Sequence, residues 1–381
     1  MEVQKGGFMT STKISNIEAI FFILTIMINH IIMNLPKSIL NFSGSSSILN
    51  IIMILIITLI IVYFITIVMK KFPNQDILDI SEYLGGKTLK IIIGILFLLY
   101  FLFSASIFLR SFCESLKIIY FRRTPIVFVI MFFITGIIIC NRLGFGAIIR
   151  SNMIFMPIIL FSIIFIFFAN ISNFDFIKMF PLFGNGIVTT FFSGISNLYA
   201  FAGLSLLYFV PPYLKREDDF EKVAFTSIIL SGIWLIFSIA TLLFIFPAIV
   251  TTDEMLPLYI ASRFIEFGRF FQRLDSIFLL IWIISILSYL SILVSLMTSI
   301  FKKLTHFKYH YANVYLFSIL TFICSLIVPN YNQSRFLKTH VYQWIVLILV
   351  FIISLAVLLF AYLKNKHKKK NVEREVRTVI E

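Results

Sequence analysis

Ten long apolar runs, separated by short polar or charged segments, make up most of this chain. Each run is close to the ~20 residues that a helix needs to cross the hydrocarbon core of a bilayer. The pattern therefore predicts ten membrane-spanning helices. Their expected bounds are about 14–35, 48–69, 89–112, 125–140, 151–169, 185–210, 223–250, 275–300, 311–328 and 342–363.

Two of these runs are irregular. The sixth has small and polar residues through its middle and ends at Pro211-Pro212, and the first is broken where Asn34 is followed closely by Pro36. A loosened helix is tolerated in a bilayer only against protein or a wet cavity, because lipid cannot bond to free backbone groups. Such breaks at equivalent places in two halves indicate an inverted-repeat transporter fold with a ligand near the midplane. Two simpler interpretations stay open: tight packing through small residues in the sixth run, and a first span that merely ends at Pro36.

Ten spans divide into five plus five. We therefore expect a single transmembrane domain over residues 1–363, with one repeat at about 14–169 and the other at about 185–363. Residues 364–381 form a basic tail that is expected to lie on anionic lipid, with docking to a partner as the alternative.

The composition supports a polytopic membrane protein, since 60% of the 381 residues are hydrophobic and only 13% are charged. The formal charge of +14 does not indicate nucleic-acid binding, because the basic residues are scattered between apolar runs or held in the tail. With the amino terminus inside, the inner segments carry 21 Lys and Arg residues and the outer loops carry 11. This excess predicts that both termini are cytoplasmic.

Motifs for catalysis, cofactors and metals are incomplete in this sequence. Gly86-Lys87-Thr88 lacks the first glycine of a phosphate-binding loop, and Gly85-Gly86 is better explained as the stop of a short polar helix that starts near Asp76. His306 and His310 are four residues apart, but neighbouring lysines favour a solvated basic rim over a metal site. We therefore expect no enzyme activity, no cofactor and no metal.

Polar faces on several spans point to a pocket. Tyr100 and Ser104 are four residues apart and share one face of the third span, and Ser285 and Tyr289 do the same in the eighth. Hydroxyl groups of this kind also join helices or bond to their own backbone. Polar faces on spans one, three, six and eight together nevertheless predict a pocket among them.

Charged residues are missing from the middle of every predicted span. Intramembrane charges usually mark proton relays and ion paths. Their absence argues against a proton-coupled pump. It favours a small, largely apolar or zwitterionic ligand held by backbone groups and hydroxyls.

Several segments in order resemble the endospore germination permease family, the membrane-embedded B subunit of nutrient germinant receptors, which is related to amino-acid permeases. The resemblance covers nearly the whole chain and lies in the order and spacing of mostly apolar pieces. These pieces are NHIIMNLPKSIL, KKFPNQDILDISEYLGG, TPIVFVIMFFITGIIICNRLGFGAIIRSNMIFMPIIL, NLYAFAGLSLLYFVPPYLKRED and YIASRFIEFGRFFQRLDSIFLLIWI.

The resemblance implies a LeuT-like fold of ten transmembrane helices, with helices 1 and 6 interrupted. It also implies assembly with A-type and C-type receptor subunits in the inner membrane of the spore. The implied role is to sense a small-molecule nutrient such as an amino acid and to signal spore germination, rather than bulk uptake.

On that fold the ligand would lie between spans one, three, six and eight. Family members often have glycines where this chain has His30 and Ile31, and a Glu where Ser205 stands, which implies a different ligand preference. The residues that the resemblance assigns to ligand binding are Asn29, Met33, Asn34, Tyr100, Ser104, Ala202, Gly203, Ser205, Ser285 and Tyr289.

Three functional hypotheses follow. The first is a ligand-sensing receptor subunit, whose bundle shifts between two states through unequal ligand affinity. The second is a secondary transporter that moves an amino acid through the same pocket. The third is a scaffold or channel subunit without a specific ligand.

Overall fold

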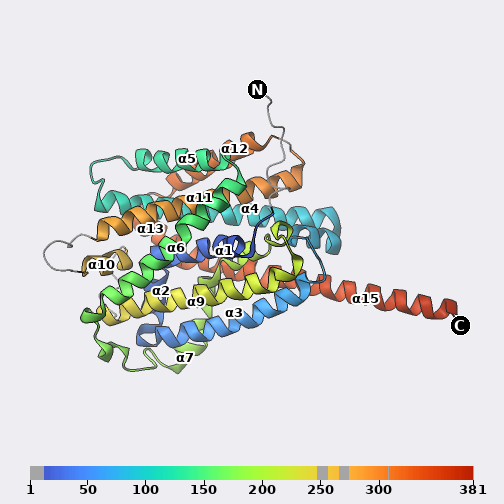
Figure 1. The fold of residues 1–381 in the computed structure, drawn as a ribbon, viewed down its shortest axis with the longest axis horizontal. Coiled ribbons are helices and arrows are strands. Elements are labelled where there is room, and N and C mark those ends of the chain that lie inside the picture. The colour runs from blue at the N-terminus through green and yellow to red at the C-terminus, as the bar shows by residue number, and fades with distance from the viewer. Residues whose placement is uncertain (1–12, 247–255, 266–273, 308, 381) are drawn as a thin grey trace.

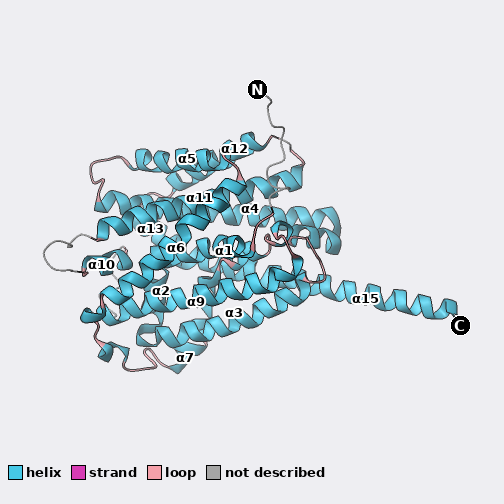
Figure 2. Cartoon of the chain, viewed as in Figure 1, coloured by secondary structure: helices cyan, strands magenta, loops and turns pink. Residues whose placement is uncertain are grey.

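The chain folds into a bundle of helices packed side by side (Figures 1 and 2). The computed structural model describes residues 13–246, 256–265, 274–307 and 309–380, with side chains described as far as His367. In this part of the chain, eight helices are long and apolar enough to cross a membrane. Two shorter apolar helices, Ile126–Arg142 and Ile187–Phe201, bring the number of spans to ten. The prediction of a helical, polytopic membrane protein is confirmed.

The first, second and fourth spans follow the predicted bounds closely, whereas the third continues to Ile119 instead of ending near 112 and the fifth begins at Phe145 instead of near 151. The third span is preceded by a short polar helix, and the two are separated by non-helical backbone at Gly85 and Gly86 (φ −131° and +70°) as the sequence predicts. The elements of this half are α1 Asn16–Met33, α2 Leu35–Ser43, η1 Gly44–Ser46, α3 Ser47–Met69, α4 Ile77–Ile119, α5 Ile126–Arg142, α6 Phe145–Ala169, η2 Ile171–Asn173 and η3 Phe176–Met179.

The second half contains more short elements. Its sixth span consists of several short helices. The helix of its seventh span, α9, ends at Ile245, and the predicted end of that span at 250 lies outside the described residues. The elements are α7 Ile187–Phe191, η4 Ser193–Phe201, α8 Leu204–Leu207, η5 Pro211–Tyr213, η6 Glu217–Asp219, α9 Phe220–Ile245, α10 Pro257–Arg263, α11 Asp275–Thr305, α12 His310–Ile327, α13 Tyr331–Phe336, η8 Leu337–Tyr342, α14 Gln343–Val346, η9 Leu347–Ile353 and α15 Ser354–Ile380.

The tenth span begins earlier than predicted. We call the continuous stretch from α13 to α15, which includes the π-helical segments η8 and η9, the last helical run. It starts at Tyr331 rather than near residue 342. A membrane helix can contain Arg335 and Lys338 because these residues line a cavity rather than lipid. The run also continues as helix through the predicted basic tail.

The helix α1 lies in the interior of the bundle and packs against α6, α9 and α11 (Figure 1). Its amino end is fixed by a capping box, in which Ser15 N donates to Glu18 Oε2 at 2.7 Å and Glu18 N donates back to Ser15 Oγ at 3.4 Å. The helix α5 turns Phe128 and Phe132 outward, and α12 does the same with Ile319 and Ile323. An apolar exterior of this kind fits lipid surroundings.

Both described chain ends lie at one end of the bundle, which we call the termini end. There Lys13 Nζ donates to Asn74 Oδ1 at 3.1 Å, and Lys364 Nζ donates to the carbonyl of Tyr83 at 2.8 Å. The opposite end, with α2, α10 and α13, is called the loop end (Figure 1). An even number of spans explains this arrangement. The side of the membrane that the termini face stays a prediction.

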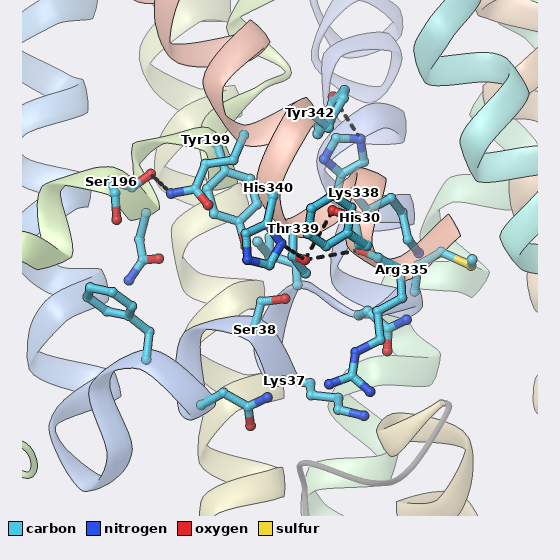
Figure 3. A pocket seen from close by; sticks show the side chains of 18 of the residues that line it. His30, Lys37, Ser38, Ser196, Tyr199, Arg335, Lys338, Thr339, His340 and Tyr342 are labelled. Carbon is cyan, nitrogen blue, oxygen red and sulfur yellow. Dashed lines mark hydrogen bonds between the residues drawn. The ribbon is translucent and has the colours of Figure 1, made fainter. Parts of the chain in front are cut away.

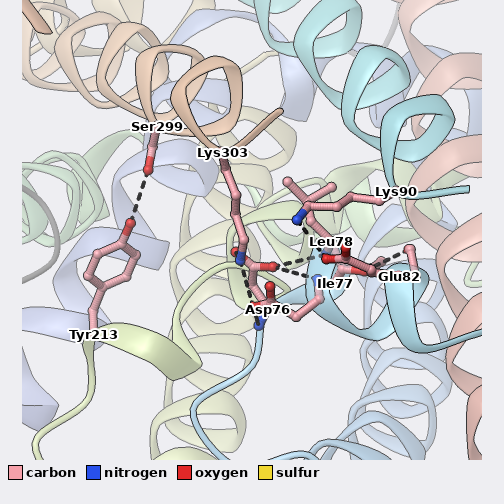
Figure 4. Close-up of polar contacts among 10 residues, drawn as sticks. Asp76, Ile77, Leu78, Glu82, Lys90, Tyr213, Ser299 and Lys303 are labelled. Carbon is pink, nitrogen blue, oxygen red and sulfur yellow. Dashed lines mark hydrogen bonds and ion pairs between the residues drawn. The ribbon is translucent and has the colours of Figure 1, made fainter. Parts of the chain in front are cut away.

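The termini end is held together by a compact group of charges (Figure 4). Asp76 caps α4, accepting from the backbone N–H of Leu78 at 2.9 Å and of Asp79 at 3.1 Å. Lys303 of α11 donates to both carboxylates, at 2.7 Å to Asp76 and 2.6 Å to Asp79. Nearby, the N–H of Ile77 donates to the carbonyl of Tyr208, so the sixth span is tied to the same group.

Candidate ligand-binding site

A cavity of about 790 Å³ lies beside the break in the first span (Figure 3). Its size falls within the range of small-molecule binding sites. It reaches the surface at the loop end, where Asn41, Phe42 and Asn332 are exposed. We call it the polar cavity. Its lining residues are His30, Met33, Asn34, Leu35, Lys37, Ser38, Asn41, Phe42, Phe108, Ser196, Asn197, Tyr199, Asn332, Arg335, Phe336, Lys338, Thr339, His340, Tyr342, Gln343 and Trp344.

The break in the first span is located at Asn34. This residue leaves helical geometry (φ −161°, ψ 2°), and Pro36 then occupies the first turn of α2, where its missing N–H is tolerated. The Asn34 side chain donates to the hydroxyl of Tyr331 at 3.2 Å and thereby joins the break to the last helical run. The predicted interruption of helix 1 is therefore present, and it borders the cavity.

The sixth span is interrupted more thoroughly. It consists of one α-helical turn, a stretch of 3-10 helix and a second short α-helix. Gly194 in this stretch lets Asn50 of α3 approach closely, because a Cβ atom on Gly194 would lie 2.1 Å from Nδ2 of Asn50. A Cβ atom on Gly203 would lie 2.6 Å from Cγ of Met27 and 3.3 Å from the carbonyl oxygen of Ile23. Gly203 thus lets the broken span press against α1.

Five aromatic side chains meet at the wall of the polar cavity, and we call them the aromatic cluster: His30, Tyr100, Phe108, Tyr289 and Tyr342. The imidazole of His30 stacks on Phe108, with ring centroids 4.3 Å apart, and its Nε2 is 3.4 Å from the hydroxyl of Tyr342. Tyr289 meets the rings of His30 and Phe108 edge-on, at 6.0 and 5.4 Å.

A chain of hydroxyl groups extends this cluster to the sixth span. The hydroxyls of Tyr342 and Tyr100 are 3.2 Å apart, and Tyr100 donates to Ser205 Oγ at 3.5 Å. Four segments are linked in this way: α1 through His30, the last helical run through Tyr342, α4 through Tyr100 and α8 through Ser205. These contacts form a continuous chain of polar groups from the first span, at His30, to the sixth span, at Ser205.

The structure brings some of the predicted site residues to the cavity and keeps others behind it. Met33 and Asn34 line the polar cavity, whereas Tyr100, Tyr289 and Ser205 belong to, or bond with, the aromatic cluster. That any of these residues binds a ligand stays a prediction.

The remaining predicted residues lie within the packed helices. Asn29 donates to the carbonyls of Thr25 and Ser285, at 2.8 and 3.3 Å, and so ties α1 to α11. The others, Ser104, Ala202, Gly203 and Ser285, are buried on α4, beside α8 and on α11, outside the cavity lining.

Sequence alone does not single out the basic part of the cavity. Lys37, Arg335 and Lys338 gather on one side of the view in Figure 3, and His30 and His340 complete the set of basic lining residues. The last helical run supplies most of them because it starts at Tyr331. The spacing of Arg335, Lys338 and Tyr342, at intervals of three and four, was a usable signal of one helical face.

The polar cavity is electrostatically one-sided. Its described lining residues include no Asp or Glu. Lys338 is only 8% exposed, its Nζ is 5.3 Å from the ring centroid of Phe108, and no described residue accepts a hydrogen bond from it. Among the described residues, no group of three or more His, Cys, Asp or Glu side chains is placed to hold a metal ion. The arrangement suits a small organic ligand with polar groups.

Two solved structures share the fold at low sequence identity. A Na⁺-coupled sialic acid symporter, in a substrate-bound outward-open state, superposes with a TM-score of 0.65 at 12% identity, covering 92% of this chain and 82% of the symporter. Mhp1, a nucleobase-cation-symport-1 family transporter in a closed conformation with bromovinylhydantoin bound, gives 0.60 at 12% identity, covering 92% and 80%. These similarities confirm the predicted LeuT-like architecture.

Sequence comparison gives the family. A profile of the family described as spore germination protein matches residues 13–334. Spore germination protein A2 of Bacillus subtilis (strain 168) is 23% identical over 280 residues, or 72% of this chain and 76% of the relative. Spore germination protein KB of the same organism is 25% identical over 217 residues, or 56% and 58%. The predicted resemblance to germination permeases is confirmed, and the chain belongs to the spore germination protein family.

Proposed function

We propose that this protein is the membrane-embedded nutrient-sensing subunit of a spore germinant receptor. It binds a small nutrient such as an amino acid in the polar cavity and signals germination through A-type and C-type partner subunits. It resides in the inner membrane of the spore with both termini in the cytoplasm. The observation that carries the proposal is the cavity of about 790 Å³ beside the break of the first span, in a chain of the germination protein family.

The construction of the cavity wall supports a sensing role. A ligand shifts a two-state equilibrium only when it binds one state more tightly than the other. The cavity wall is built from α1, α2, α4, η4 and the last helical run. Hydroxyl contacts of 3.2 to 3.5 Å in the aromatic cluster link three of these pieces, α1, α4 and the last helical run, to one another and to α8. A ligand that fills the cavity contacts several of these pieces at once, so its affinity depends on how they are arranged.

Blocking the cavity tests the proposal. Ser38 lies in α2 and lines the cavity, so Ser38→Trp is expected to fill it and to abolish the germination response of spores to the nutrient. Thr135 of α5 is an exposed residue outside the cavity lining, so Thr135→Trp is a matched control that is expected to keep the response. A normal response in Ser38→Trp spores that contain the protein at the usual level would contradict a sensing role for the cavity.

A secondary amino-acid transporter is the second candidate, because both solved structures described above are transporters. Transport would also require a path through the termini end, where Lys303 of α11 pairs with Asp76 and Asp79 at the start of α4. Counterflow of labelled amino acids in proteoliposomes separates the two functions. Saturable exchange favours the carrier, and binding without exchange favours the receptor subunit.

A further inference from the structure

The side chain of Lys338 is the most unusual feature of the polar cavity. It lies in the span Tyr331–His367, is more than nine-tenths buried, and its ammonium group has no hydrogen-bond acceptor among the described residues. Buried polar atoms in proteins nearly always have a partner, and a buried cation without one is costly. An ionisable residue inside a membrane span is by default a candidate functional group.

The surroundings of Lys338 add charge of the same sign. Lys37, on α2, is 3% exposed, and Arg335 lies one turn before Lys338 on the last helical run. All three line one cavity, whose described lining contains no carboxylate. Clefts lined by one sign of charge concentrate ligands of the opposite sign.

The same wall offers a nonpolar surface next to the charge. The ammonium of Lys338 lies over the ring of Phe108, on whose plane the imidazole of His30 is stacked. A ligand whose anionic group meets Lys338 can therefore rest a short apolar part against these rings. The hydroxyl of Tyr342 and the amides of Asn34 and Gln343 supply neutral polar contacts.

We propose that the polar cavity recognises a carboxylate, and that Lys338 is the residue that pairs with it. The ligand class is a small carboxylic acid of zero or negative net charge, with or without an ammonium group, which narrows the largely apolar or zwitterionic ligand that the sequence predicts. This proposal rests on the proposed function and names its ligand class. It excludes neutral sugars and cationic amines as principal ligands.

The test uses the full-length protein in lipid nanodiscs. Its thermal unfolding midpoint is measured with each of the twenty standard amino acids, with propionate and with glucose, because a ligand of the native state raises the midpoint by mass action. For the compound with the largest effect, three probes are titrated: the acid, its primary amide and the acid without its ammonium group. Both acids are expected to bind, and the amide is expected to bind about tenfold more weakly or worse.

Variants assign the effect to Lys338. Lys338→Gln is expected to weaken binding of the acids by about tenfold or more, without affecting the amide, and Lys338→Arg is expected to keep most of the affinity. Lys117 is a half-buried lysine of α4 outside the cavity lining, so Lys117→Gln is the matched control and is expected to bind normally. Correct folding of each variant is checked by size-exclusion chromatography and by its unliganded midpoint.

Contrary results are distinguishable. If the amide binds as tightly as the acid, or if Lys338→Gln binds the acids normally, Lys338 merely faces cavity water and the carboxylate proposal is overturned, although binding as such supports the proposed function. If glucose alone raises the midpoint, the ligand class is wrong and a nutrient site remains. If no probe does so, the carboxylate proposal is overturned, and the Ser38→Trp spores decide the proposed function independently.

Discussion

The two ends of the bundle differ in whether a buried charged side chain has a partner. At the termini end, Asp76 is almost fully buried, and Lys303 reaches it and Asp79 within 2.7 Å. At the loop end, Lys338 is equally buried, but no described residue accepts a hydrogen bond from it. A buried charge with an ion-pair partner can hold two elements together, whereas a buried charge without one lowers the stability of the protein unless a bound ligand pairs with it. The comparison therefore separates a structural cluster from the site that we propose to bind a ligand.

The electrostatics of Asp76 fit a structural role. Burial raises the pKa of this carboxyl group, and the ammonium of Lys303 opposes the rise. Its two backbone hydrogen bonds cap the start of α4, and its ion pair with Lys303 holds that start against the end of α11. The largest effects on stability are consequently expected at this end.

The strongest test of the comparison is Lys303→Met. This variant leaves two neighbouring carboxylates without their cation, so we expect a loss of about 3 kcal/mol in the free energy of unfolding, measured by thermal unfolding in nanodiscs. Lys87→Met, at an exposed lysine of the same end, is the control and is expected to have little effect. An unchanged midpoint in Lys303→Met would show that the cluster does not stabilise the fold.

A second variant separates the cap from the ion pair. Asparagine caps helices as well as aspartate does, so Asp76→Asn keeps the backbone hydrogen bonds and loses only the charge. Because Asp79 still pairs with Lys303, we expect a smaller loss of about 1.5 kcal/mol. Asp76→Ala removes both contributions and should be clearly worse. Equal midpoints for the two variants would mean that the cap contributes nothing.

The same substitution at the loop end should have the opposite sign. Lys338→Met removes a buried charge without removing a partner, so we expect the protein to gain about 1 kcal/mol in stability. The germination response to the nutrient should nevertheless be lost. Measuring both properties in one variant is decisive, since a destabilised Lys338→Met protein would show that this lysine is part of the structural framework.

The smallest expected effect concerns the aromatic cluster. Tyr100→Phe removes hydroxyl contacts with Tyr342 and Ser205 and should cost about 0.5 kcal/mol, with a measurable rise in the nutrient concentration needed for germination. Tyr208→Phe is the control, because its hydroxyl donates to the carbonyl of Val350 away from the cavity lining. A comparable shift of the germination response in both variants would remove the cluster from the proposed signal path.

Much of the fold follows from periodicity and from a few residues. Long apolar runs predict the ten spans, Pro36 and Gly203 mark the two interruptions, and Gly85 with Gly86 stops the short helix before the third span. Arg110 and Glu114, four residues apart on one face of α4, form an ion pair at 2.6 Å. These features are local, so sequence spacing alone is enough to predict them.

The cavity is different because its lining comes from distant segments. Hydropathy assigns Arg335, Lys338 and His340 to a loop, since a polar stretch looks unsuitable for lipid. In the structure Lys338 instead lines the cavity, together with Lys37 from α2, some 300 positions away in the chain. Which face of a polar helix meets protein depends on tertiary packing, and no local pattern in one sequence shows that.

The last helical run has a mechanical consequence. It borders the cavity at Tyr342 and then passes through η9 into α15, which packs against α3 and α4 before its end extends beyond the other helices in Figure 1. The 27 residues of α15 span roughly 40 Å, so one continuous helical run connects the cavity wall with the far end of the bundle. Under the proposed sensing role, a small rotation of this run beside the cavity would become a larger displacement at its tip.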